Sequence, residues 1–254
     1  MPNRFGPRPT AAVGAHRTAH VGPDVTAYPA PMARRWVACT PGGGVLARGL
    51  ERINARHPWN HNDHFHGWLV ENLPNPCRAV LDVGCGRGEL LTRLATVAPR
   101  VVGCDVDTTM RRLAEQRCAG LGNVSILGGP WAEIEGPFDA VTMIAVLHHL
   151  DVERALGDVI DLLVPGGRFL AVGLAIPRSL PDHLWDAASI LNPIIGYLKH
   201  PRPSRVLPDS RPTPVRDPDL SFDELRGVLH RVMPGSIIRH RLGFRHTIAW
   251  TKPS

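Results

Sequence analysis

The sequence predicts an α/β fold in which a seven-stranded, mostly parallel sheet has helices on both faces and ends in an antiparallel hairpin. From residue 79 onward, apolar runs of strand length alternate with amphipathic helical patterns, and this order builds a parallel sheet. A glycine-rich loop separates the first of these runs from the next helical pattern. The chain has 254 residues, of which 43% are hydrophobic, so it is long enough to bury one sizeable core.

The predicted elements follow in order along the chain. Helical patterns at residues 45–55 and 61–71 precede the first strand. Late in the chain, Ser221 and Glu224 form a capping-box pattern that begins a further helix, and Gly243 marks the turn of the hairpin. Strands are predicted at 79–82, 101–105, 124–127, 140–144, 168–172, 237–240 and 246–250, and helices at 89–97, 109–119 and 152–163.

Two segments depart from this alternation. Residues 1–42 carry Pro, Gly, Ala and Arg without sustained periodicity, so we expect a disordered or loosely packed basic tail. Residues 176–219 hold a short helical pattern at 185–191 and a proline-rich connection. We expect this segment to be an insertion that covers the ligand edge of the sheet, within one catalytic domain at residues 43–254.

The composition favours a cytoplasmic protein without a membrane span. No apolar run approaches the roughly 18 to 20 residues that a span needs. The net charge of +6 comes largely from the tail, so it is a weak indication of a nucleic-acid partner. The cysteines are odd in number and form no CxxC pair, as in a reducing compartment: Cys39, Cys77, Cys85, Cys104 and Cys118.

The stretch VLDVGCGRGELL, residues 80–91, is a strand, loop and helix junction that is shaped to bind a ligand. A dinucleotide-binding fingerprint needs a third glycine or alanine at its sixth position. The sixth residue is Glu89 when the count begins at Gly84 and Leu91 when it begins at Gly86, so the fingerprint is absent. No Gly-Lys-Ser/Thr follows, which excludes a Walker phosphate loop. Asp82 heads the loop and Asp105 ends the next strand, where a carboxylate could accept two hydrogen bonds from a ribose. The arrangement favours an adenosine without phosphates.

With these motifs the chain resembles the class I S-adenosylmethionine (SAM)-dependent methyltransferases, in their small-molecule branch of the bacterial natural-product type. VLDVGCGRG matches the family's first motif, an apolar strand followed by D-x-G-x-G-x-G, and Asp105 matches its second-strand acid. FDAVTMIAVLHHL, residues 138–150, is similar to the fourth-strand motif, and LLVPGGRFLAVG to the fifth. The resemblance covers about residues 60–175. It implies a Rossmann-like fold, SAM as cofactor and methyl transfer as the reaction.

The resemblance also implies a cofactor site. Asp82 would orient the loop and the methionine ammonium, Asp105 would hold the ribose hydroxyls, and Val106 would cover one adenine face. Gly129 stands where many members carry the aspartate that reads adenine, so we expect backbone groups near it to replace that contact. The implied cofactor-binding residues are Asp82, Gly84, Cys85, Gly86, Asp105, Val106, Gly129, Pro130, Trp131, Ile144, and, from the helix that folds over the cofactor, His61 and His64.

The acceptor is expected beside the fourth strand. His148 and His149 follow that strand directly, and histidine can take a proton near neutral pH, so they are the candidate catalytic residues. They could instead cap the next helix or line the pocket without titrating. Trp185 and Tyr197 in the insertion are the expected acceptor walls. No metal is expected, because no complete ligand set accompanies the histidines at 57–66.

The predicted function is the transfer of a methyl group from SAM to oxygen, nitrogen or carbon of a small molecule, such as a phenol or indole in secondary metabolism. One alternative is an RNA or protein methyltransferase. The chain lacks the Asn/Asp-Pro-Pro-aromatic motif of the amino-methylating kind, and aromatic residues make up only 6% of it, which gives few platforms for stacking bases. A non-catalytic SAM-binding subunit is the other alternative. The expected partner is the small-molecule acceptor, with neither nucleic acid nor membrane, and a homodimer stays open.

Overall fold

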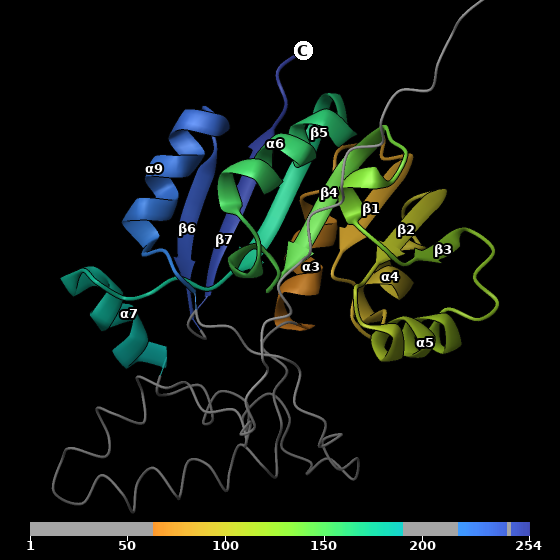
Figure 1. Cartoon of the computed structure of the whole chain (residues 1–254), viewed down its shortest axis with the longest axis horizontal. Helices are drawn as coiled ribbons and strands as arrows, with labels where there is room; N and C mark the ends of the chain where they lie inside the picture. Colours follow the sequence, from red (N-terminus) through yellow and green to blue (C-terminus); the bar gives the residue numbers. More distant parts are fainter. Residues whose placement is uncertain (1–62, 190–217, 243–244) are drawn as a thin grey trace, which may run out of the picture.

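The computed structural model of the chain describes residues 63–189, 218–242 and 245–254 (Figure 1). Within these residues the chain folds around one sheet, and no helix there is long and apolar enough to cross a membrane. Several predictions fall outside the described residues: the tail at 1–42, the helical pattern at 45–55, most of the insertion at 176–219, His61 and Tyr197.

The sheet has seven strands in the order β3-β2-β1-β4-β5-β7-β6, which confirms the predicted fold class. The first five strands run parallel, so their carboxyl ends meet at one edge of the sheet. The last two form an antiparallel hairpin, and β7 pairs with β5. The strands are β1 (Ala79–Val83), β2 (Arg100–Cys104), β3 (Val124–Leu127), β4 (Phe138–Ile144), β5 (Leu163–Gly173), β6 (Ile237–Arg241) and β7 (Arg245–Thr251).

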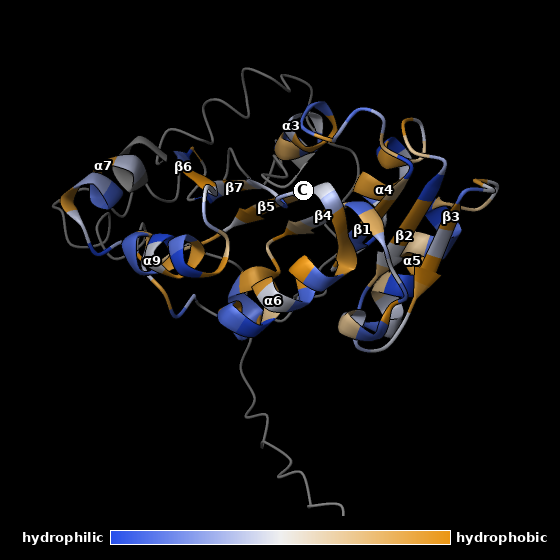
Figure 2. Cartoon of the chain, turned by 90° about the horizontal axis from the view of Figure 1, so that it is seen from above, coloured by the Kyte–Doolittle hydropathy of each residue, from blue (hydrophilic) through white to orange (hydrophobic). Residues whose placement is uncertain are grey.

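Helices cover both faces of the sheet. One buried cluster joins α3, α4 and α5 to the sheet, and a second joins α6 and α9 to it. Figure 2 shows α3 on one side of the strands and α6 and α9 on the other. The helices are η1 (Asp63–Phe65), α3 (His66–Glu71), α4 (Glu89–Leu94), α5 (Thr108–Arg117), η2 (Trp131–Glu133), η3 (Leu147–His149), α6 (Val152–Leu162), α7 (Leu180–Ser189) and α9 (Phe222–Val232).

Side-chain caps fix where the helices begin. The predicted capping box is confirmed: the Ser221 hydroxyl accepts from the Glu224 amide, and the Glu224 carboxylate accepts from the Ser221 amide. Asp107 caps α5 by accepting two backbone amides of its first turn, and Asp151 caps α6 by accepting the Arg154 amide. These caps place the amino ends of α5, α6 and α9 at the edge where the parallel strands end.

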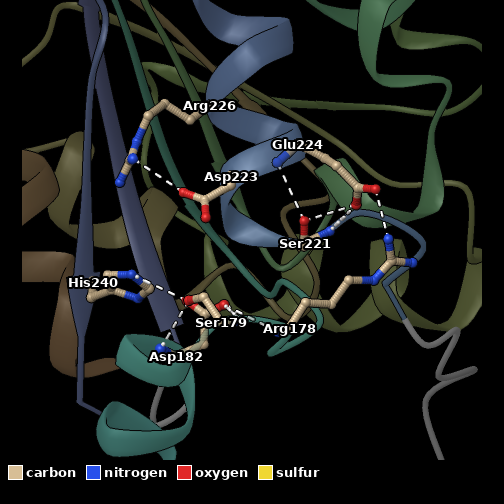
Figure 3. Close-up of polar contacts among 8 residues, drawn as sticks. All are labelled: Arg178, Ser179, Asp182, Ser221, Asp223, Glu224, Arg226 and His240. Atoms are coloured by element: carbon tan, nitrogen blue, oxygen red, sulfur yellow. Dashed lines mark hydrogen bonds and ion pairs between the residues drawn. The ribbon is translucent and has the colours of Figure 1, made fainter.

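The predicted helix at 185–191 begins earlier, because α7 starts at Leu180. Asp182 accepts the amides of Arg178 and Ser179, and the Ser179 hydroxyl accepts the Asp182 amide, which is a reciprocal cap (Figure 3). The predicted start at residue 185 was wrong because this cap, and not the apolar pattern, fixes where the helix begins.

The fifth strand also differs from its prediction. The VPGG segment was expected to precede a strand at 168–172, but β5 already begins at Leu163. Phe138 of β4 pairs with Leu163, the register then shifts, and Ala140 pairs with Arg168. The VPGG segment is therefore a bulge within β5, between its two pairings with β4, and does not separate β5 from the preceding helix.

Candidate functional site

The glycine loop leaves the carboxyl end of β1 and is tied to the end of β2. The amides of Gly84 and Cys85 both donate to the Cys104 carbonyl, at 2.8 and 2.9 Å. Gly84 has φ +70° and Gly86 has φ +54°, backbone conformations that glycine adopts without strain. The loop can therefore turn back sharply beside the carboxyl ends of β1 and β2, with its amides held by hydrogen bonds within the protein.

Asp105 holds this loop in place. One carboxylate oxygen accepts the Gly86 amide at 2.9 Å and the other accepts the Asp107 amide at 2.8 Å. The Arg111 guanidinium donates to the Asp105 carbonyl at 2.7 Å, which fixes the backbone at the same residue. A carboxylate oxygen has a second lone pair, so Asp105 can accept further hydrogen bonds from a bound hydroxyl group while it orders the loop.

Asp82 is buried at the head of the loop, with 3% of its surface exposed. Burial raises the pKa of Asp82 to about 7, the hydrogen bond from the Thr142 hydroxyl at 2.7 Å opposes this increase, and the negative charge of Asp105 adds to it. A carboxyl group in this condition responds to a nearby positive charge by releasing its proton. Asp82 can therefore couple the loop to a cationic ligand.

The segment after β4 is strained. Ala145 has φ 56°, the only positive φ of a non-glycine residue among the described residues, and its amide donates to the Val172 carbonyl at 2.7 Å. Val146 follows, and its Cγ2 lies 2.2 Å from the place where a Cβ on Gly84 would stand. The strain brings this segment against the glycine loop, and strain of this kind concentrates at functional sites.

The two predicted catalytic histidines take different positions on η3. Their ring centroids lie 4.1 Å apart, but His148 is half-buried whereas His149 is exposed. A cavity of about 410 Å³ lies beside η3, and His148 lines it while His149 does not. The structure thus separates His148, which faces a space for a ligand, from its neighbour.

The same cavity is lined by His246, a residue that the sequence analysis missed. His246 is the second residue of β7 and is 1% exposed. Burial lowers the pKa of His246 to about 3, and the nearby Arg245, His240 and His148 add to the effect. Its position could have been suspected from β7, where His246, Ile248 and Trp250 alternate on one face and only the histidine is polar.

The other predicted cofactor contacts differ in their exposure. Val106 is 84% exposed at the tip of β2, and Gly129 and Pro130 are exposed after β3. Trp131 is half-buried against the core, and Ile144 ends β4, also half-buried. His64 is exposed and its ring lies edge-on to Phe65, with centroids 5.2 Å apart.

Trp185 lies away from the cavity that His148 lines. Its ring stacks on His240 at 6.0 Å, and His240 stacks on Phe222 at 3.6 Å. Asp182 lies 3.4 Å from His240, so α7 is attached to β6 and α9 by this pair and this stack (Figure 3). The structure therefore does not bring Trp185 to the predicted acceptor position beside His148.

Comparisons with known proteins agree with one another. Residues 80–167 match a family model described as a methyltransferase domain. An uncharacterised methyltransferase of Mycobacterium tuberculosis is 33% identical over 205 residues, which cover 77% of this chain and 98% of the relative. A demethylmenaquinone methyltransferase of Tropheryma whipplei is 30% identical over 102 residues, 39% of this chain and 43% of that protein. A SAM-dependent methyltransferase structure from Aquifex aeolicus has a TM-score of 0.50 at 16% identity, covering 80% of this chain and 97% of that one.

Proposed function

This chain belongs to the class I SAM-dependent methyltransferases, and from that premise we propose that its acceptor is a small molecule that binds beside His148. The observation that carries the proposal is the cavity of about 410 Å³ next to η3, a size that suits a small molecule. The name of the Tropheryma whipplei relative, which gives demethylmenaquinone as its substrate, supports the same class of acceptor.

The residues around the glycine loop fit SAM. Nothing lies within 4 Å of the place where a Cβ on Gly86 would stand, so the backbone there is open to close approach, and Asp105 retains lone pairs for ribose hydroxyls. Asp82 supplies a carboxyl group that a bound ammonium would ionise. We therefore propose that Asp82, Gly84, Cys85, Gly86 and Asp105 hold the cofactor.

Four other regions complete the proposed cofactor site. Val106 would cover one face of the adenine. The edge of the adenine would be contacted by Gly129, Pro130 and Trp131, and the methionine part of SAM by Ile144. His64 and His61 would close the site, although His61 lies outside the described residues.

SAM supplies a methyl group on a positively charged sulfur, which is already activated for transfer. The protein must therefore align the acceptor and keep water out, a contribution of roughly 7 to 11 kcal/mol in favourable cases. If the acceptor loses a proton, a ring nitrogen of His148 is the group placed to take it. His149, which is exposed, would then shape η3 and the start of α6.

More specifically, we propose that the acceptor is an electron-rich aromatic compound of secondary metabolism and that the protein methylates it in the cytoplasm. The described cysteines are free thiols, which supports a reducing compartment: Cys77, Cys85, Cys104 and Cys118.

The proposal is tested by incubating the purified protein and a bacterial extract with SAM that carries a labelled methyl group. We expect the label in small molecules that pass a small-pore filter and separate from SAM by chromatography. An Asp105→Asn variant is expected to transfer roughly 10- to 100-fold less at low SAM, because one carboxylate contact to the ribose is lost. Asp161→Asn, on the exposed side of α6, is the control. Label retained in RNA or protein would support the macromolecular alternative, and SAM binding without any transfer would support a non-catalytic subunit.

A second test follows from the buried acid. Since the pKa of Asp82 is about 7 without ligand, SAM binding should release a proton below that pH, and the affinity should fall as pH decreases from 7 to 5, by up to about 10-fold per pH unit. Calorimetry in buffers of different ionisation enthalpy measures the released proton. Asp82→Asn should flatten the pH dependence in this window. Retention of the same slope in this variant would show that Asp82 is not the group that releases the proton.

A further inference from the structure

The cavity beside η3 is built from elements that are far apart in the sequence. It is bounded by η3 and the first turn of α6, the end of β5, the segment before α9, the first turns of α9 and the start of β7. The Ile176 amide donates to the Leu220 carbonyl at 2.9 Å, which closes the frame between β5 and α9. Figure 2 shows α6 and α9 side by side on this face of the sheet. The apolar side chains that line the cavity are Leu147, Leu150, Val152, Leu174, Leu220, Leu225 and Val228.

His246 lies in the wall of this cavity. Its Nε2 is buried and has no hydrogen-bond partner among the residues that the structure describes. The atom lies against Gly173, the β5 residue that pairs with His246, and a Cβ on Gly173 would stand 2.5 Å from it. A buried polar atom without a partner destabilises a folded protein, so such atoms are rare and call for an explanation.

Packing alone does not explain the imidazole. The next residues on the same face of β7 are Ile248 and Trp250, which belong to the apolar cluster with α6 and α9. An apolar ring would fill the position of His246 without leaving a polar atom unsatisfied. His246 and Gly173, against which its Nε2 packs, both line the cavity, so a ligand bound at this wall would lie next to the unpartnered nitrogen.

We propose that this cavity binds the hydroxyl-bearing part of an uncharged, largely apolar acceptor, and that His246 is the residue that hydrogen-bonds the hydroxyl. The inference rests on the proposed function, since the cavity borders His148. A hydroxyl both donates and accepts, so it suits an imidazole nitrogen in either tautomer. The low pKa of His246, about 3, keeps the ring uncharged at any physiological pH.

The charges around the cavity disfavour an anionic ligand. Asp151, Glu153 and Asp219 line it and are exposed, and none of its described lining residues is Lys or Arg. Glu153 is paired with Arg231, but three carboxylates at the wall still disfavour a carboxylate or phosphate on the acceptor. Neutral hydroxyl compounds are therefore the favoured class.

Three probes of the same size test the proposal by direct binding: 1-naphthol, 1-methylnaphthalene, which lacks the hydroxyl, and 1-naphthoate, which is an anion. Binding is measured by fluorescence titration of the full-length protein with saturating SAM. We expect 1-naphthol to bind about 10-fold more tightly than 1-methylnaphthalene, and 1-naphthoate to bind least. Equal affinities for naphthol and methylnaphthalene would overturn the role of His246, and no binding by all three would overturn the cavity as the site.

Two variants assign the preference. His246→Phe keeps a ring and should remove the preference for naphthol while leaving SAM affinity unchanged, whereas His246→Gln, which can still hydrogen-bond, should restore part of it. His230→Phe on the exposed side of α9 is the control. A preference that persists in His246→Phe overturns the assignment. The binding readout is independent of methyl transfer, so failure of the labelling experiment and failure of this inference are distinguished.

Discussion

Replacement of Gly84 by alanine is expected to lower the free energy of unfolding by about 2 to 4 kcal/mol and to abolish measurable SAM binding. The residue has φ +70°, where a side chain is strained, and a Cβ would stand 2.2 Å from Cγ2 of Val146. The χ1 angle of valine is stiff, so the methyl group cannot move away freely. The loop would have to separate from the segment after β4. Urea unfolding and calorimetry with SAM measure the two effects.

Two further variants separate strain from steric contact. Gly86→Ala meets nothing within 4 Å at φ +54°, so only the backbone strain of roughly 1 to 2 kcal/mol is expected in the absence of ligand. Val146→Ala in the Gly84→Ala background removes the clashing methyl and should restore part of the stability. The contact between the glycine loop and Val146 would not limit stability if Gly84→Ala lowered the free energy of unfolding no more than Gly86→Ala does. The same would follow if Val146→Ala restored no stability to Gly84→Ala.

The order of strands and helices was predictable because local patterns decide it. Each parallel strand is a short apolar run that ends in a turn, and β3 has the bounds that the sequence predicted. The glycine loop was predictable for the same reason, since positive φ at Gly84 and Gly86 restricts the residue type. The start of α7 was not, because its cap uses Asp182, where the usual pattern has Glu or Gln.

The placement of Asp82 and Asp105 was predictable because the carboxyl ends of parallel strands share one edge. The sequence pattern did not indicate that the Asp105 carboxylate also accepts the backbone amides of Gly86 and Asp107. Trp185 was expected beside the acceptor, but the contact of Asp182 with His240 attaches its helix elsewhere. That contact joins distant parts of the chain, so no local pattern contains it.

His246 was missed for a related physical reason. Because β7 runs antiparallel to β5, its first residues lie at the edge where the parallel strands end. The pairing of His246 with Gly173 brings it to a cavity that His148 also lines, although the two histidines are far apart in the sequence. The register of a terminal hairpin depends on long-range pairing, which alternation within one strand does not determine.

The burial that makes His246 a neutral group should also make the protein sensitive to acid. Its pKa is about 3 in the folded protein and about 6.5 when the chain unfolds, so the unfolded state binds the proton first as pH falls. Above pH 6.5 the residue has no effect on the pH dependence, and between pH 6.5 and about 3 the free energy of unfolding should fall by about 1.4 kcal/mol per pH unit.

His246→Phe should therefore be at least as stable as the wild type at pH 7 and should gain about 2 kcal/mol relative to it at pH 5. Urea unfolding of both proteins at several pH values gives this difference in the free energy of unfolding. Both proteins contain the same carboxylates, so the effect of their titration cancels in the difference. Arg245, His240 and His148 lie near the ring and, after burial, further lower the pKa of His246. Parallel stability curves for the two proteins would mean that folded His246 takes up a proton as readily as the unfolded chain. The residue could not then be the uncharged hydrogen-bonding group of the cavity.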